Sequence, residues 1–227
     1  MGKNNCPICA AVSRDFVPVP FDFSRGGERS FRYRECPVCH AFFCETMRDW
    51  SAADYRERIY NADYIKTDRE FDGTRARNLA PLIIEQLHAA GCHRVLDYGG
   101  GPGYLTDLLR EAGFEADCFD PFGRQDAAGP EKYDCVLAVE VLEHEIDAPA
   151  IWRKILAGLR AGGLFLATTE FCDGKDLERW FYANPRAGHT LLYSRAAFHY
   201  MAIRHGLDYR GDVRENIHLL WNMKGKP

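Results

Sequence analysis

Two pairs of cysteines near the amino terminus have the residue types and the spacing of a metal site. The pairs are Cys6-Pro7-Ile8-Cys9 and Cys36-Pro37-Val38-Cys39, separated by residues 10–35. Each pair places two thiolates on a tight turn, and two such turns together provide the tetrahedral sulfur shell that Zn²⁺ prefers. Iron and unmetallated thiols are the alternatives. Because four thiolates leave no open position for a substrate, the zinc expected at Cys6, Cys9, Cys36 and Cys39 is structural.

A glycine-rich segment in the middle of the chain has the features of a nucleoside site. The apolar stretch Val95-Leu96-Asp97-Tyr98 runs into Gly99-Gly100-Gly101-Pro102-Gly103, and such a turn before a helix lets backbone N–H groups approach a ligand. A nicotinamide dinucleotide is less favoured, because Tyr104 stands where the G-x-G-x-x-G fingerprint has its last glycine. Asp120, at the end of the next expected strand, is placed to accept both hydroxyls of a ribose. A tight turn without a ligand is the alternative.

These residues must be positioned by strands that alternate with helices. The apolar pattern predicts strands at 93–98, 115–119, 133–139, 164–169, 206–211 and 216–221, and helices at 74–90, 104–112, 149–159 and 195–205. Such an alternation is typical of a parallel sheet with right-handed crossovers. The last two strands are expected to form an antiparallel hairpin. The predicted fold class is therefore α/β.

From residue 74 to residue 223 the chain resembles the class I S-adenosylmethionine-dependent methyltransferases. The resemblance rests on the glycine turn, on residues 133–144 with their Glu143-His144 ending, and on the turn 160–164. It implies a Rossmann-like sheet and S-adenosylmethionine as the cofactor, with the methionine end beside the first and fourth strands and the ribose beside the second. A solvated helix start is the alternative for the acids after the fourth strand. The cofactor residues that the resemblance implies are Asp97, Tyr98, Gly99, Gly101, Asp120 and Glu140.

One region departs from that family. Residues 121–132 are too few for the helix and the third strand that usually follow the ribose-binding acid and contact adenine. We therefore expect a shortened third-strand region, in which the sheet loses an edge strand. In its place Pro121-Phe122-Gly123, together with Gln125 or Asp126, is expected to fold over the adenine, which adds Phe122 and Asp126 to the predicted cofactor residues.

An aromatic segment after the expected strand 164–169 is the candidate acceptor side. It runs from Trp180 to His189 and is rich in Pro, Gly and Asn, which suits a loop that covers a pocket. Methyl transfer to oxygen or nitrogen needs a group that titrates near neutrality to remove the acceptor proton. We expect His189 to be this base, with His144 as the second choice and Tyr182 orienting the acceptor. The alternatives are structural: a loop anchor, a helix-terminus residue and a packing residue, respectively.

The expected organisation has three parts: a zinc ribbon at 1–47, a helical linker at 48–73 and a Rossmann-like methyltransferase domain at 74–227. The linker begins at Ser51, which forms a capping-box pattern with Asp54. The ribbon and the linker look like the front end of a bacterial group of zinc-ribbon methyltransferases associated with cell-surface sugars and secondary metabolites. By analogy, this resemblance implies a small polar acceptor such as a sugar or a sugar nucleotide.

Composition bounds the partners. The 29 Lys and Arg residues against 33 Asp and Glu residues give a net charge of −4, so the surface has no general attraction for nucleic acid or anionic lipid. The apolar stretches are far shorter than the roughly 18 residues of a membrane span, and residues 1–20 lack the apolar core of an export signal. We therefore expect a cytoplasmic enzyme with a small-molecule acceptor. A non-catalytic nucleoside-binding module anchored by the ribbon, and an RNA or protein methyltransferase, are the alternatives.

Overall fold

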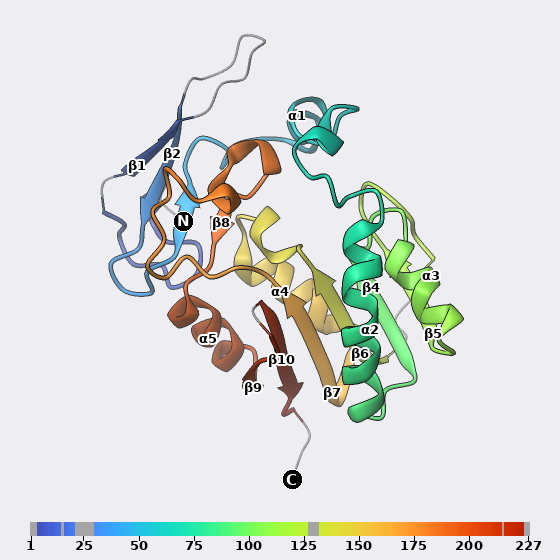
Figure 1. Cartoon of the computed structure of the whole chain (residues 1–227). Coiled ribbons are helices and arrows are strands. Elements are labelled where there is room, and N and C mark those ends of the chain that lie inside the picture. The colour runs from blue at the N-terminus through green and yellow to red at the C-terminus, as the bar shows by residue number, and fades with distance from the viewer. Residues whose placement is uncertain (1–3, 15, 21–29, 127–131, 215, 225–227) are drawn as a thin grey trace. The chain divides into compact units, whose positions relative to one another are not determined.

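The computed structural model describes residues 4–14, 16–20, 30–126, 132–214 and 216–224, and the chain forms two compact units (Figure 1). The first, which we call the ribbon unit, comprises Met1–Asp68, Leu142–Pro149 and Glu170–Met201. The second, the sheet unit, comprises Arg69–Val141, Ala150–Thr169 and Ala202–Pro227. Each unit is therefore assembled from segments that lie far apart in the sequence.

The sheet unit contains the α/β sheet that the sequence predicts. Its strand order is β5 (Glu115–Phe119), β4 (Arg94–Tyr98), β6 (Tyr133–Val139), β7 (Leu159–Thr168), β10 (Ile217–Asn222) and β9 (Leu207–Asp212). The first four strands in this order are parallel to one another, and β10 is antiparallel to both of its neighbours. The parallel sheet and the closing hairpin are thus confirmed.

The shortened third-strand region is also confirmed. Among the residues that the structure describes, the sheet ends at β5, with no strand beyond it. The chain that leaves β5 turns back at once, because the N–H of Asp120 donates to the carbonyl of Arg124 and Phe119 forms an isolated bridge with Gln125. This short return takes the place of an edge strand.

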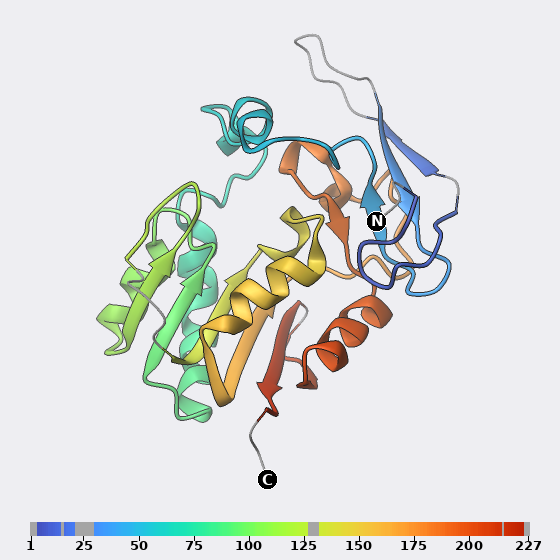
Figure 2. The same cartoon turned by 180° about the vertical axis from the view of Figure 1, so that it is seen from behind.

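Helices cover both faces of the sheet, as the alternation of side chains along a strand requires. On one face, α2 (Thr74–Ala89) and α3 (Tyr104–Glu111) pack in a cluster that includes Cys135 and Leu137 of β6. On the other face lies α4 (Ala148–Ala157), whose Trp152 meets Phe165 of β7 edge to face. Figure 1 shows α2 in front of the strands, and Figure 2, from behind, shows α4.

Strand β7 differs from the prediction in its starting point. It begins at Leu159, and the predicted helix 149–159 ends earlier, at Ala157. Gly162 adopts a positive φ of 72° inside the strand, and the register with β6 shifts between Tyr133 and Cys135. An irregularity of this kind lets a strand continue through a glycine turn that local patterning marks as a break.

The ribbon unit has its own antiparallel sheet, in the order β1 (Phe16–Pro20), β2 (Ser30–Glu35), β3 (Phe42–Cys44) and β8 (Leu191–Leu192). The last strand closely follows the predicted acceptor-side segment, and both its leucines are buried. The core of the unit likewise joins Phe31 and Tyr33 to Trp180 and Tyr182. Residues of the expected ribbon at 1–47 therefore share a sheet and a core with residues expected in the methyltransferase domain.

Short helices complete the ribbon unit. The capping box predicted at Ser51 and Asp54 is present at the start of α1 (Ala52–Arg58). Among its described residues, four 3₁₀ turns follow along the chain: η1 (Tyr64–Lys66), η2 (Leu142–His144), η3 (Phe181–Ala183) and η4 (Pro185–Ala187). Helix α5 (Arg195–Arg204) begins in this unit. Within the described part of the chain, no helix combines the length and the apolar character that crossing a bilayer requires.

Candidate cofactor and metal sites

The glycine loop connects β4 to α3 at the carboxyl end of the parallel strands. Gly99 adopts a φ of 79°, which favours glycine, and a Cβ atom built on it would lie 2.4 Å from Cγ2 of Val141. Gly103, at the start of α3, has a φ of 90°. The loop therefore needs glycine for its backbone conformation and for its close approach to the segment after β6.

Asp97, the last buried residue of β4, lies beneath this loop. Its side chain is 1% exposed and accepts a hydrogen bond of 2.8 Å from the hydroxyl of Thr106 on α3. A Cβ atom on Gly100 would lie 2.5 Å from its Oδ2. Burial raises the pKa of Asp97 to about 6, partly offset by the bond from Thr106. Its contact with a cofactor stays a prediction.

The buried carboxylate of Asp97 should cost stability that Asp97→Asn recovers. A pKa raised from 3.8 to about 6 means that the folded protein holds a proton that the unfolded chain releases, so wild-type stability falls as the pH rises from about 4 to about 6. Asn keeps an oxygen for Thr106 and does not titrate. The difference in free energy of unfolding, variant minus wild type, should rise by about 2–3 kcal/mol between about pH 4 and about pH 6. Above that range it should level off. Urea unfolding at several pH values measures it.

The exposed aspartate Asp176 supplies the control substitution, Asp176→Asn, which corrects for the general effect of exchanging a carboxyl for an amide. A difference between Asp97→Asn and wild type that does not change with pH would show that burial does not perturb Asp97.

Asp120 stands at the end of β5, as predicted, and its carboxylate organises the loop. Its Oδ2 accepts from the N–H of Gly101 at 3.0 Å and its Oδ1 from the N–H of Phe122 at 2.7 Å. A carboxylate has about four acceptor positions, so it retains the capacity to accept ribose hydroxyls. The N–H of Arg124 also donates to the carbonyl of Gly101 at 2.9 Å, so the two loops form one structure.

The two residues predicted beside the adenine differ in their surroundings. Phe122 is 47% exposed next to the glycine loop. Asp126 instead forms ion pairs with Arg110 at 2.9 Å and with Arg124 at 2.6 Å. Asp126 therefore holds the return segment through two ion pairs, whereas about half of the Phe122 side chain is exposed.

The end of β6 carries Glu140 in a conformation that is uncommon for a residue with a side chain. Its φ is 53°, its N–H donates to the hydroxyl oxygen of Thr168 at 2.9 Å, and that hydroxyl donates to Glu140 Oε1 at 2.8 Å. Thr168 ends the adjacent strand β7, so two neighbouring strands fix the carboxylate. Backbone strain maintained in this way is often found at functional sites.

Several residues of this site were missed by the sequence analysis. The hydroxyl of Thr106 donates to Asp97, and that of Thr168 donates to Glu140. Phe71 lies 3.9 Å from a Cβ atom built on Gly101. A hydroxyl one turn into the helix after a glycine loop is the only signal that the sequence offers for Thr106. Tyr98, which was predicted, packs its ring 5.3 Å from that of Phe119.

The ribbon unit brings together the predicted catalytic residues around Glu143. Oε1 of Glu143, a fully buried residue, lies 4.0 Å from Nε2 of His144 and 4.0 Å from Nε2 of His189. The ring of Tyr182 lies 4.2 Å from that of His189. One carboxylate and two imidazoles can share a proton or hold a divalent metal ion. The role of Glu143 as their common neighbour was not predicted.

Backbone carbonyls set the orientation of these imidazoles. Nδ1 of His189 lies 2.6 Å from the carbonyl oxygen of Tyr182, and Nδ1 of His144 lies 3.1 Å from the hydroxyl of Tyr60 and 3.3 Å from the carbonyl oxygen of Gly188. Because a carbonyl only accepts, this network assigns the proton of neutral His189 to Nδ1 and leaves Nε2 as a proton acceptor that faces Glu143.

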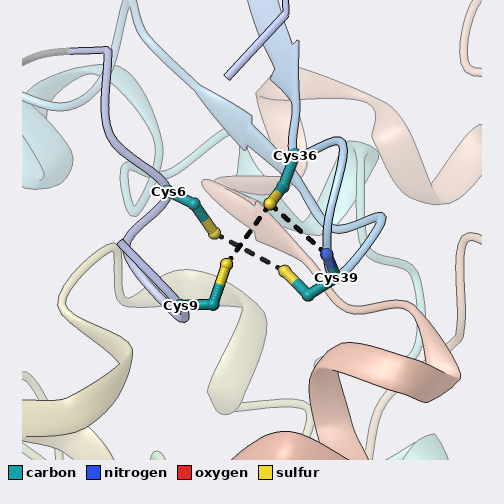
Figure 3. Close-up of side chains that lie close together, drawn as sticks. All are labelled: Cys6, Cys9, Cys36 and Cys39. Atoms are coloured by element: carbon teal, nitrogen blue, oxygen red, sulfur yellow. Dashed lines mark hydrogen bonds between the residues drawn. The ribbon is translucent and has the colours of Figure 1, made fainter. Parts of the chain in front are cut away.

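The four predicted metal ligands converge in the ribbon unit, and Figure 3 shows their sulfur atoms directed toward one another. Sγ of Cys6 lies 3.6 Å from Sγ of Cys39, and Sγ of Cys9 lies 3.4 Å from Sγ of Cys36. All four sulfur atoms lie within 4.8 Å of one another. A tetrahedral zinc site with Zn–S bonds of about 2.3 Å has sulfur atoms about 3.8 Å apart, so this set fits zinc.

A family model described as a methyltransferase domain matches residues 54–210. Over 88 residues the chain is 51% identical to a ubiquinone biosynthesis O-methyltransferase of Methylobacterium nodulans, an alignment that covers 39% of this chain and 27% of that protein. The chain spans less than half the length of the curated relatives it matches.

Among solved structures, TnmH is similar with a TM-score of 0.56 and 16% identity, over 78% of this chain and 63% of that chain. PigF, solved with S-adenosylhomocysteine, has a TM-score of 0.55 and 17% identity over the same shares. These likenesses show the fold. Because the family model covers residues 54–210, well over half of the sequence, the chain belongs to the methyltransferase-domain family.

Proposed function

We propose that this protein transfers a methyl group from S-adenosylmethionine to a small acceptor molecule. The observation that carries the proposal is the glycine loop with Asp97 beneath it and the carboxylate of Asp120 at its side. Family membership supports it, as do relatives named O-methyltransferases and a similar structure solved with S-adenosylhomocysteine. The bound cofactor supplies an activated sulfonium methyl group.

The residues of the sheet unit fit such a cofactor. Two acceptor positions of Asp120 suit the ribose hydroxyls, and the exposed ring of Phe122 suits the adenine face. Glu140, fixed by Thr168, offers a carboxylate at the end of β6 for the ammonium of the methionine part. Each of these groups comes from the carboxyl end of a parallel strand or from the loop after it, where ligands of open α/β sheets bind.

We assign the removal of the acceptor proton to His189. Its Nδ1 is held by the carbonyl of Tyr182, so Nε2 is the atom that accepts the proton. The imidazolium formed in this way has Oε1 of Glu143 at 4.0 Å, which stabilises the positive charge. His144 has the same relation to Glu143 and is the second candidate. Tyr182 packs against the base, and we propose that it orients the acceptor.

His189→Ala should lower turnover at least tenfold, within the range for loss of a general base, and leave cofactor affinity nearly unchanged. Added imidazole should restore part of the rate, because a base is missing and not a packing contact. His199→Ala, which removes an exposed imidazole of α5, is the control and should keep wild-type turnover. Wild-type turnover of His189→Ala at equal zinc content would exclude this residue as the base.

We further propose that the acceptor is small and polar. The resemblance to the zinc-ribbon group implies a sugar or a sugar nucleotide, and the names of the relatives point to methylation of oxygen. A panel of sugar nucleotides and of hydroxylated aromatic compounds, assayed for release of S-adenosylhomocysteine, tests both. Turnover with a member of the panel supports methyl transfer. Cofactor binding with no turnover on these acceptors, on RNA or on protein would favour a non-catalytic nucleoside-binding module instead.

The four clustered thiols are proposed to hold Zn²⁺. The spacing of their sulfur atoms supports this assignment, and the hydrogen bond from Cys39 lowers the pKa of Cys6 to about 5, which favours a thiolate at neutral pH. Such a closed shell stabilises the ribbon unit and takes no part in the reaction.

A further inference from the structure

The sheet unit contains a cavity of about 420 Å³ that the proposed reaction does not use. It is lined at the amino end of β7 by Leu159 and Arg160, at the start of β9 by Leu207, and by Lys132, which directly precedes β6. The glycine loop and Glu140 lie at the carboxyl ends of these parallel strands. The cavity therefore lies at the amino ends of the strands, about 20 Å from the glycine loop along a strand of this length.

The lining is basic, although the chain as a whole carries a net charge of −4. Lys132, Arg160 and Lys224 contribute cationic groups, and among the described residues that line the cavity none is acidic. Arg160 forms an ion pair with Asp134 at 2.7 Å. The ammonium of Lys132 donates to the carbonyl of Ala157, which uses one of its three protons.

The interaction of Lys132 with the carboxyl end of α4 accounts for only part of the positive charge around the cavity. Ala157 is the last residue of α4, and a cation there interacts favourably with the helix dipole. Lys224 comes from the segment after β10, and its aliphatic stem lies 3.4 Å from a Cβ atom built on Gly206. The chain thus brings cations from three separate segments to one cavity that also has apolar walls, formed by Leu156, Leu159 and Leu207.

His205 adds an imidazole to the lining of the cavity. The side chain lines the cavity, and its Nε2 is buried with no hydrogen-bond partner among the described residues. Its ring stacks on Trp152 at 5.7 Å. Burial lowers the pKa of His205, and the cations Arg204, Lys224 and Arg153 lower it further, which favours a neutral imidazole with one N–H to donate.

We propose that this cavity is a second ligand site, which binds a small molecule with an anionic head group on an apolar body. The head group, a carboxylate or a phosphate, lies among Lys132, Lys224 and His205. The apolar body lies against the leucines. This site is separate from the cofactor site and does not depend on the proposed methyl transfer.

Hexanoate and hexyl phosphate are suitable probes, with uncharged hexanol as the comparison, and calorimetry on the zinc-loaded protein measures their binding. We expect at least one of the two anions to bind with one-to-one stoichiometry and at least tenfold more tightly than hexanol. Fluorescence of Trp152, isolated by comparison with Trp152→Phe, should change on binding because its ring stacks on His205.

The double variant Lys132→Gln/Lys224→Gln should weaken binding of the preferred anion at least tenfold. Lys66→Gln/Lys175→Gln, which makes the same change of charge in the ribbon unit, should leave the affinity within twofold, and urea midpoints verify that both variants fold. The proposal is wrong if neither anion binds saturably, if hexanol binds as tightly, or if both double variants bind alike.

Discussion

Cys36→Ser should abolish stoichiometric zinc binding and unfold the strands of the ribbon unit. Cys36 is fully buried, its Sγ lies 3.4 Å from Sγ of Cys9, and it accepts from the N–H of Cys39. Structural zinc contributes about 10–16 kcal/mol of apparent binding free energy in zinc-finger peptides, more than most whole domains have as stability. Without the fourth thiolate, the two cysteine turns lose the ion that joins them.

The measurement combines zinc content by mass spectrometry with hydrogen exchange. Amides of β2 and β3 should lose protection in Cys36→Ser, because these strands directly precede and follow the second cysteine turn. Cys172→Ser is the matched control: this buried thiol lies outside the cluster and donates to the carbonyl of Leu192, which a serine hydroxyl can also do. The control should keep one equivalent of zinc. Full zinc content and wild-type protection in Cys36→Ser would contradict the assignment.

Gly99→Ala should weaken binding of S-adenosylmethionine by roughly a hundredfold, about 2.7 kcal/mol. The added methyl group would lie 2.4 Å from Cγ2 of Val141, and the φ of 79° disfavours alanine in addition. Relief of this clash requires the loop to move, and the loop provides the N–H groups that approach the ligand. Calorimetric titration of the variant gives the change in affinity directly.

Gly113→Ala separates the clash from the backbone strain. Gly113 has a similar φ of 93°, but nothing lies within 4 Å of a Cβ atom built on it. Gly99→Ala should lose more stability than Gly113→Ala, because only the first adds a clash to the backbone strain, and Gly113→Ala should bind the cofactor as the wild type does. Equal affinities for the two variants would show that the close approach of Gly99 to Val141 has no role in binding.

The sheet could be predicted because its signals are local. Buried strands such as β6, the glycine turn after β4 and the hairpin at the end of the chain each follow from patterns within a few residues. The missing edge strand could also be predicted, because residues 121–132 are too few for the helix and the strand that the resembled family has there. The four cysteines converge as expected, because paired Cys-Pro-x-Cys turns are typical of a shared metal site.

The parts that could not be predicted depend on contacts between distant segments. Strand β8 is only Leu191–Leu192, and its pairing with Phe42 and Phe43 of β3 has no local signal. The same holds for Glu143, whose place between His144 and His189 results from the folding together of two segments that are distant in the sequence. Thr168 ends a strand as an ordinary β-branched residue, and only the structure shows that it fixes Glu140.

Parallel calorimetric titrations of the zinc-loaded protein with S-adenosylmethionine, S-adenosylhomocysteine and NAD test the central claim most directly. The glycine loop, Asp97 and Asp120 predict micromolar binding of the first two at one equivalent each. They predict no binding of NAD, because Tyr104 begins α3 where a dinucleotide fingerprint requires glycine. Binding of NAD, or no binding of either S-adenosyl compound, would contradict the assignment of this loop as an S-adenosylmethionine site.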